Sequence, residues 1–193
     1  MAKYFPEMLA EHQNFIKKQH LFFIATAPLE AAGHVNLSPK GYDTLRILSS
    51  TEIAYLDLTG SGNETSGHID ENARITFMFC AFEGPPMILR LYGSGKVILP
   101  ETEEWDRLIG HFEMMPGARQ IILAKIHKVQ TSCGYSVPFM TYSSERETLN
   151  RYNMKKDEAE LENYLREKNS STIDGIVTPL GKKLSNDSRP NKQ

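Results

Sequence analysis

A loop rich in small and hydroxyl residues follows an apolar run in Tyr55-Leu-Asp-Leu-Thr-Gly-Ser-Gly-Asn-Glu-Thr65, and it is well suited to binding a ligand. Gly60 and Gly62 let backbone N–H groups approach a ligand closely. Side-chain donors come from Thr59, Ser61, Asn63 and Thr65. The loop enters a predicted helix that ends near Asn72, and the first N–H groups of a helix attract anions because they lack intrahelical partners. The pattern indicates a phosphate cradle. It is neither a Walker loop nor G-x-G-x-x-G, and a turn with an ordinary helix cap is the alternative.

A second polar set lies upstream in Gly33-His-Val-Asn-Leu-Ser-Pro-Lys-Gly41. Val35 and Leu37 alternate with His34, Asn36 and Ser38, which is the period-two pattern of a half-buried strand. Pro39 cannot donate to a sheet ladder, so the strand ends there or lies at an edge. One strand therefore carries Asn36, Ser38 and Lys40, and the next one ends in the Gly/Ser loop.

The elements that position these residues are mostly strands. Apolar or alternating runs predict strands at 21–27, 34–38, 52–58, 74–82, 87–99 and 120–131. Helical spacing and start signals predict helices at 4–19 and 65–72, from Pro100 onward, and at about 144–154 and 157–168. We expect one domain over residues 1–178, with C-terminal helices from about residue 144. Residues 179–193 are rich in Lys, Asn and Ser, which predicts a disordered tail.

Composition is that of an ordinary globular protein, with 24% charged and 40% apolar residues among 193. A net charge of −2 gives no general attraction for nucleic acid or an anionic membrane. We find no signal-peptide pattern and no apolar run of the ~18 residues that a spanning helix needs. The two cysteines, Cys80 and Cys133, form no disulfide framework. These features predict a cytoplasmic protein with reduced thiols.

Five motifs in this chain resemble those of the flavin-binding split-barrel family typified by pyridoxamine 5′-phosphate oxidase. They are His34–Gly41, Asp57–Thr65, Phe79–Pro86, Leu89–Gly93 and Thr131–Tyr135, and the resemblance extends over about residues 20 to 175. It implies a mainly β fold, a six-stranded antiparallel split β-barrel with peripheral helices. It also implies a homodimer with FMN bound at the subunit interface.

The resemblance also implies which residues contact FMN. Asn36, Ser38 and Lys40 would lie along the isoalloxazine ring and phosphate, and the ribityl and phosphate loop would comprise Thr59, Ser61, Gly62, Asn63 and Thr65. Arg90 and Tyr92 would approach the ring from another strand. Cys133 and Tyr135 would close the site. In one version of this hypothesis, these two residues belong to the partner protomer. No residue is assigned a catalytic role.

Glu64 departs from the family pattern. The oxidase uses basic residues around the FMN phosphate, whereas this loop contains an acidic residue and no Lys or Arg. A carboxylate 4 Å from a phosphate would cost on the order of 1–4 kcal/mol. Glu64 must therefore point away or be paired, or the anion is held by Lys40, Arg74 or backbone alone. The oxidase's site for pyridoxamine phosphate is not recognisable in the C-terminal region.

Other chemistries fit the sequence less well. The six histidines show no metal-binding spacing, so we predict no metal site. Cys80 lies in an apolar run and is interpreted as a buried core thiol. Cys133 and His127 lie about 20 Å apart along a strand, too far for a catalytic pair. His34 is the one histidine that we consider for a role beside the flavin, because it begins the strand of Asn36–Lys40.

Three hypotheses follow from the sequence. The first is an FMN-dependent oxidoreductase with an unknown small-molecule redox substrate, possible electron donors including NADH and NADPH. The second is a flavin-binding module without turnover, such as a redox-responsive partner. The third is a dimeric barrel that binds haem, a deazaflavin or no cofactor.

Overall fold

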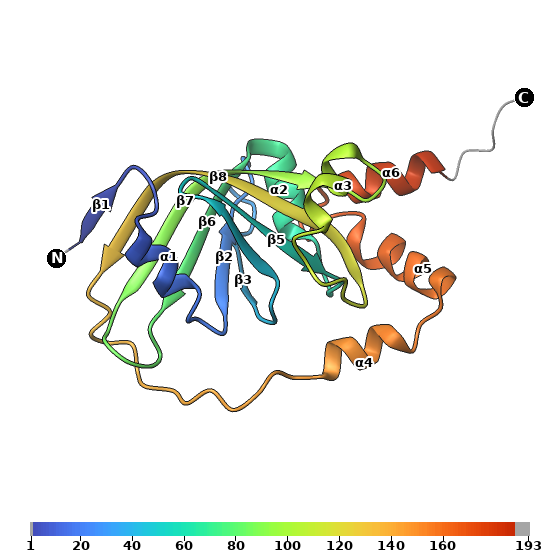
Figure 1. Cartoon of the computed structure of the whole chain (residues 1–193). Helices are drawn as coiled ribbons and strands as arrows, with labels where there is room; N and C mark the ends of the chain where they lie inside the picture. Colours follow the sequence, from blue (N-terminus) through green and yellow to red (C-terminus); the bar gives the residue numbers. More distant parts are fainter. Residues whose placement is uncertain (1, 188–193) are drawn as a thin grey trace, which may run out of the picture.

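One antiparallel sheet dominates the structure, a computed structural model that describes residues 2–187 (Figure 1). Its strands are β1 (Lys3–Phe5), β2 (Phe22–Thr26), β3 (Asn36–Lys40), β4 (Leu45–Ser49), β5 (Glu52–Leu58), β6 (Arg74–Cys80), β7 (Ile88–Ile98) and β8 (Ala118–Ser132). They follow the order β3-β2-β6-β7-β8-β5-β4, and β1 pairs with the far half of β8. The sheet curls into a split barrel whose two ends, β3 and β4, are joined by the short turn at residues 41–44.

All six predicted strands are present, and two further strands were missed. β3 begins two residues later than predicted and is an edge strand, as Pro39 required. β4 is a five-residue edge strand, too short for a clear period. β1 consists of three residues that form a strand by pairing with Val129–Thr131. Such pairing is a tertiary event that local sequence does not encode.

Two apolar layers enclose the central strands. Inside the barrel, Phe77, Leu91 and Ile122 belong to one buried cluster together with Tyr55. On the outside of β5 and β8, a second cluster forms under α3 (Glu103–Ile109), which buries Trp105 and Leu108. Residues 53–56 of β5 and 121–124 of β8 are therefore covered on both faces, which explains why these stretches are continuously apolar.

The remaining helices lie at the margins of the sheet (Figure 1). They are α1 (Ala10–Ile16), α2 (Glu64–Asn72), α4 (Thr148–Met154), α5 (Glu158–Asn169) and α6 (Pro179–Asp187). The prediction of a disordered tail is wrong for residues 179–187, because α6 buries Leu180 and Leu184 one helical turn apart. The prediction rested on the Lys, Asn and Ser content of the segment and did not take the spacing of these two leucines into account. Residues 188–193 of the predicted tail lie outside the described residues.

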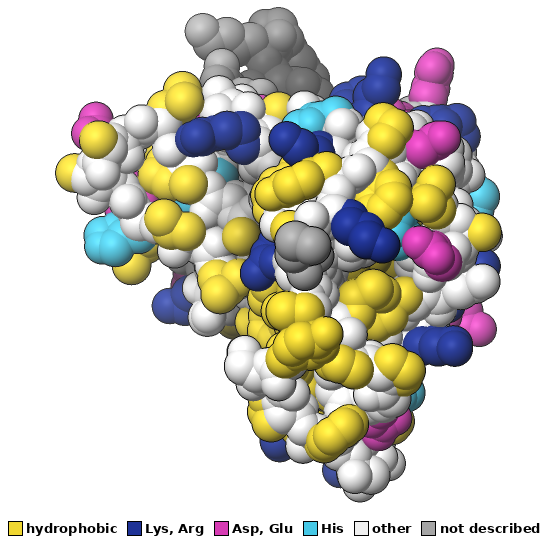
Figure 2. Space-filling view, turned by 90° about the vertical axis from the view of Figure 1, so that its left-hand side faces the viewer, with side chains coloured by type: hydrophobic (Ala, Val, Ile, Leu, Met, Phe, Trp, Pro, Cys, Tyr) yellow, Lys and Arg dark blue, Asp and Glu magenta, His cyan; other side chains and the backbone are white. Residues whose placement is uncertain are grey.

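An extended strap without helix or strand, residues 133–147, connects β8 to α4. It carries exposed hydrophobic side chains, among them Tyr135 at 82% and Phe139 at 84% of full exposure. Figure 2 shows hydrophobic side chains gathered in the middle and lower part of the face at the β1 end of the molecule. Among residues 2–187, no helix is both long and apolar enough to span a bilayer.

Candidate functional site

A cavity of about 820 Å³ opens between β3, the loop at residues 59–63 and the segment at residues 167–173. Eight of the twelve residues predicted for the site line it: Asn36, Ser38, Lys40, Thr59, Ser61, Gly62, Asn63 and Thr65. Asn36, Ser38 and Lys40 share one face of β3, while Leu37 and Pro39 point to the other face. The structure thus brings the two polar segments of the sequence together.

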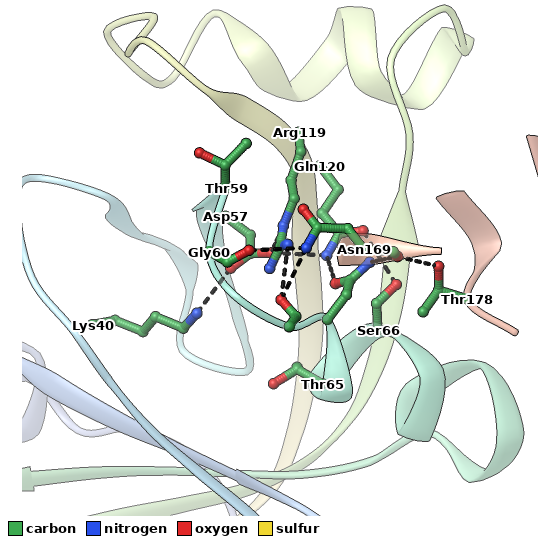
Figure 3. Close-up of polar contacts among 12 residues, drawn as sticks. Lys40, Asp57, Thr59, Gly60, Thr65, Ser66, Arg119, Gln120, Asn169 and Thr178 are labelled. Carbon is green, nitrogen blue, oxygen red and sulfur yellow. Dashed lines mark hydrogen bonds and ion pairs between the residues drawn. The ribbon is translucent and has the colours of Figure 1, made fainter. Parts of the chain in front are cut away.

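Asp57 stands at the centre of the polar network beside this cavity. Its Oδ1 accepts from Lys40 Nζ at 2.9 Å, and its Oδ2 accepts from Arg119 Nε and Gln120 Nε2, each at 2.8 Å. Figure 3 shows the three donors converging on Asp57 from β3 and β8. The Lys40 contact links β3 to β5, so this ion pair bridges the open side of the barrel.

A β-bulge explains how two successive residues of β8 reach the same carboxylate. Asp57 pairs with Gln120 and Leu58 pairs with Ala118, which leaves Arg119 as the extra residue. Bulges redirect side chains that would otherwise alternate between faces. Both Arg119 and Gln120 are therefore aimed at Asp57.

The charge on Asp57 is maintained despite its burial, with 2% of the residue exposed. Burial alone would raise its pKa, but Arg119, Lys40 and the hydrogen bonds from Lys40 and Gln120 hold the pKa well below its usual range. Asp57 is thus a carboxylate flanked by two cations. Together the three groups carry a net charge of +1 at neutral pH.

Thr59 and Asn63 point into the scaffold, although both border the cavity. Thr59 Oγ1 donates to Asn153 Oδ1 at 3.0 Å, which ties the loop to α4. Asn63 Nδ2 donates to the backbone oxygen of Asn169 at 3.1 Å, and its Oδ1 accepts from Gln120 Nε2 at 2.8 Å. The side chains of Thr59 and Asn63 therefore hold the loop in place.

Asn169, the last residue of α5, fixes the backbone of the same loop (Figure 3). Its Nδ2 donates to Gly60 O at 2.9 Å, and Tyr164 of α5 also donates to Gly60 O at 3.1 Å. Arg119 donates to Gly62 O at 2.9 Å. The C-terminal helices and β8 thus determine the shape of the loop.

A chain of side-chain hydrogen bonds leads from the cavity into the protein. Ser38 Oγ donates to Asn36 Oδ1 at 2.9 Å, and Asn36 Nδ2 donates to Thr65 Oγ1 at 3.0 Å. Asn36 Nδ2 also lies 3.4 Å from Thr26 Oγ1, which contacts His68 Nδ1 at 3.0 Å. Because Ser38 donates to Asn36, its hydroxyl oxygen can accept from a ligand in the cavity.

Glu64 is oriented by the C-terminal segment. Its Oε2 accepts from the backbone N–H of Ile173 at 3.0 Å. Its Oε1 lies near the loop, 2.9 Å from the position that a Cβ on Gly62 would take. Glycine at position 62 therefore makes room for the Glu64 carboxylate. Glu64 still lines the cavity, so it does not point away from the ligand space.

Four predicted site residues lie elsewhere in the chain. Arg90 and Tyr92 are on the outer face of β7, and Tyr92 Oη donates to Gln130 Oε1 at 2.6 Å. Cys133 and Tyr135 follow the end of β8, and both are exposed. None of the four lines the cavity at β3. Arg74, considered as a holder of an anion, instead donates to Asn72 and to the backbone of Pro28.

Several residues of the site were missed by sequence reasoning. They are Arg119, Gln120, Tyr164, Lys168, Asn169 and the turn at residues 171–173. Arg119 and Gln120 did leave a signal, since two polar residues directly precede the apolar run at residues 121–124. The C-terminal residues left none, because their role depends on where α5 docks.

His34 is anchored to the C-terminal turn and not to the cavity. Its Nδ1 contacts Asp174 Oδ1 at 2.6 Å, and its backbone N–H donates to Asp174 Oδ2 at 2.8 Å. The hydrogen bond that the His34 ring donates to the Asp174 carboxylate raises the pKa of His34. Cys80 is buried, as predicted. Among the described residues, no group of three or more His, Cys, Asp or Glu could hold a metal ion.

Comparisons with known proteins agree with this architecture. The family described as pyridoxamine 5′-phosphate oxidase matches residues 8–133. The pyridoxamine 5′-phosphate oxidase family protein ustO of Aspergillus flavus is 37% identical over 195 residues, which cover 89% of this chain and 76% of that protein.

Two solved structures share the fold at low sequence identity. A point variant of HupZ from Group A Streptococcus has a TM-score of 0.52 at 18% identity, covering 65% of this chain and 99% of its own. A Lactobacillus delbrueckii protein named for the same oxidase has a TM-score of 0.51 at 16% identity, covering 65% of this chain and 94% of its own. The matched residues, the relative and the split-barrel fold together show that this chain belongs to the pyridoxamine 5′-phosphate oxidase family.

Proposed function

We propose that the cavity between β3 and the loop at residues 59–63 binds a flavin, and that the protein is an oxidoreductase. The observation that carries this proposal is that eight residues expected at a flavin line a single cavity of about 820 Å³. Cofactor sites typically measure about 300–1,000 Å³. FMN is the flavin that the family implies, and the substrate is a small redox-active molecule.

The residues of the cavity suit the ring and the ribityl chain of a flavin. A bound flavin supplies the redox chemistry, and the protein orients it and tunes its potential. Ser38 offers a hydroxyl oxygen as an acceptor. Lys40, whose side chain is 23% exposed, offers a positive charge that would stabilise an anionic reduced ring. Ser61 in the loop and Thr65 at the start of α2 offer hydroxyl groups in the same cavity.

The proposal is tested first by an absorbance spectrum of the purified protein, before and after mixing with FMN. Flavin bands that persist through gel filtration would support it. Bleaching by NADH or NADPH, followed by reoxidation with an acceptor, would support turnover over a flavin-binding module without activity. A colourless protein that retains no added flavin would contradict the proposal and leave another cofactor or none.

We expect Lys40→Met to weaken flavin binding roughly ten- to a hundred-fold, because a hydrogen bond to a charged group is worth about 1.5–3 kcal/mol. The flavin's reduction potential should also fall, since an anionic reduced ring loses its counter-charge. Titration and a reductive potential measurement check both. Lys96→Met serves as the control, because Lys96 is 64% exposed and pairs with Glu104. Unchanged affinity and potential in Lys40→Met would rule out this role.

We also propose that the protein is a homodimer and that the outer face of the β3–β2–β6–β7–β8 sheet meets the second copy. Strand pairing places apolar residues of three adjacent strands side by side on this face: Phe23, Ala25, Leu37, Pro39 and Met78. Arg90 and Tyr92 continue the same rows. In such a dimer, residues that do not line the protomer's own cavity could complete that of its partner.

Leu37→Asp is expected to dissociate the dimer, because a buried unpaired charge at an apolar interface is strongly unfavourable. The mass measured by sedimentation or light scattering should fall to that of one chain. Leu29→Asp is a matched control, since Leu29 is 64% exposed against 61% for Leu37 and lies in the loop before β3. A wild-type protein that is monomeric at micromolar concentration would refute the dimer.

A further inference from the structure

The entrance to α2 has the form of an anion site, but the protein places its own anion there. Asn63 is the N-cap of α2 and Glu64 is its first residue. A carboxylate in the first turn interacts favourably with the partial positive charge at a helix N-terminus. Glu64 therefore places a carboxylate in the cavity, next to the N-terminus of this helix.

The Glu64 carboxylate is held by a hydrogen bond from the C-terminal turn and lies against the loop. The backbone N–H of Ile173 binds Oε2 at 3.0 Å, and Oε1 lies over Gly62, whose missing Cβ would come within 2.9 Å of it. A phosphate approaching the loop would have to displace a carboxylate fixed by the C-terminal turn. The loop itself carries no Lys or Arg that could offset the repulsion.

The cations around the cavity are largely committed to other partners. Lys40 and Arg119 both bind Asp57, and Arg119 also donates to Gly62 O. Lys168 lines the cavity, and so does its acidic sequence neighbour Glu167. With Asp57, Glu64 and Glu167 set against Lys40, Arg119 and Lys168, this set of side chains has no net positive charge to offer a phosphate dianion.

A fixed carboxylate is, however, a strong acceptor for hydroxyl groups. In dinucleotide sites an acidic side chain binds a sugar hydroxyl in the same manner. Ser61 and Thr65 line the same cavity and provide further hydroxyl partners. The combination of Glu64, Ser61 and Thr65 is thus suited to a polyol chain that ends in a free hydroxyl.

We propose that Glu64 makes this site selective for a flavin with an unphosphorylated ribityl chain, riboflavin itself, over FMN. This inference rests on the flavin binding proposed above. Glu64 accepts hydrogen bonds from the ribityl hydroxyls and repels a terminal phosphate. The C-terminal turn at residues 171–173 contributes by fixing the carboxylate.

The proposal is tested by titrating the full chain with riboflavin and with FMN. Binding is measured by the quenching of flavin fluorescence. We expect wild type to bind riboflavin about ten-fold more tightly than FMN. Glu64→Gln should reduce this ratio to near one, since the amide oxygen can still accept from Ile173. Glu64→Lys should reverse the preference. Glu71→Gln is the control, because Glu71 lies on the same helix but bonds Leu29 N instead of lining the cavity.

The outcomes separate the two proposals. If neither flavin binds a protein that circular dichroism shows to be folded, both flavin binding and the selectivity are refuted. If wild type binds FMN more tightly than riboflavin, or Glu64→Gln leaves the ratio unchanged, the flavin site stands and the role of Glu64 is refuted. A melting curve of each variant shows whether the loss of the Ile173 contact has unfolded it.

Discussion

Replacing Asp57 with Asn is expected to destabilise the protein by about 3–5 kcal/mol, the usual cost of removing one partner from a buried ion pair. Asp57 is 2% exposed, and its carboxylate is the ion-pair partner of both Lys40 and Arg119. The guanidinium of Arg119, with 4% of its side chain exposed, would lose its counter-charge. Urea unfolding followed by tryptophan fluorescence measures the loss.

The difference between wild type and Asp57→Asn should depend on pH. The pKa of Asp57 is depressed in the folded protein, so its stabilising contribution is complete above the unfolded-state pKa of about 3.9. It is lost as pH falls below that value toward the depressed folded-state pKa. The difference in unfolding free energy between wild type and Asp57→Asn should therefore be constant from about pH 6 to 8. It should shrink below about pH 4.

Asp43→Asn is the matched control for this experiment. Asp43 also pairs with an arginine, Arg46 at 2.7 Å, but its side chain is 84% exposed. An exposed pair contributes about 0–1 kcal/mol, so this change should have little effect. Equal losses in the two variants would show that the Asp57 network does not stabilise the fold in this way.

Gly117→Ala is expected to cost about 3–5 kcal/mol, from backbone strain and from broken buried hydrogen bonds. Gly117 has a φ of +79°, in the left-handed region that Ala adopts only with strain. An added Cβ would lie 2.2 Å from Asn153 Nδ2 and 2.6 Å from Thr59 Oγ1. The change would push apart the two side chains that tie the loop to α4, so flavin affinity should fall as well.

Thermal unfolding checks this prediction, and a loss of this size should lower Tm by roughly 6–20 °C in a chain of this length. Gly110→Ala is the control, because a Cβ there meets nothing within 4 Å and Gly110 has ordinary helical backbone angles. That variant should be unchanged or slightly stabilised. If Gly117→Ala behaves like Gly110→Ala, the tight packing of Thr59 and Asn153 is not important for stability.

The sequence by itself determined the strands with clear periodicity and the two polar segments of the site. The alternation of Asn36 and Ser38 with Val35 and Leu37 predicted the face of β3 that borders the cavity. Alternation is a local property, because successive side chains of a strand point to opposite faces. The short strands β1 and β4 carry too few residues for such a pattern, and they exist through pairing with β8 and β5.

Only the tertiary structure decided what each residue of the site does. Thr59 and Asn63 look like ligand donors in the sequence, yet they bind Asn153 and Asn169, which are 94 and 106 residues away. Arg119 reaches Asp57 because of a β-bulge in β8 that the local sequence does not predict. Glu64 is fixed by Ile173, a residue 109 positions away. These contacts depend on how distant segments dock, and their energy is gained only when the whole fold brings them together.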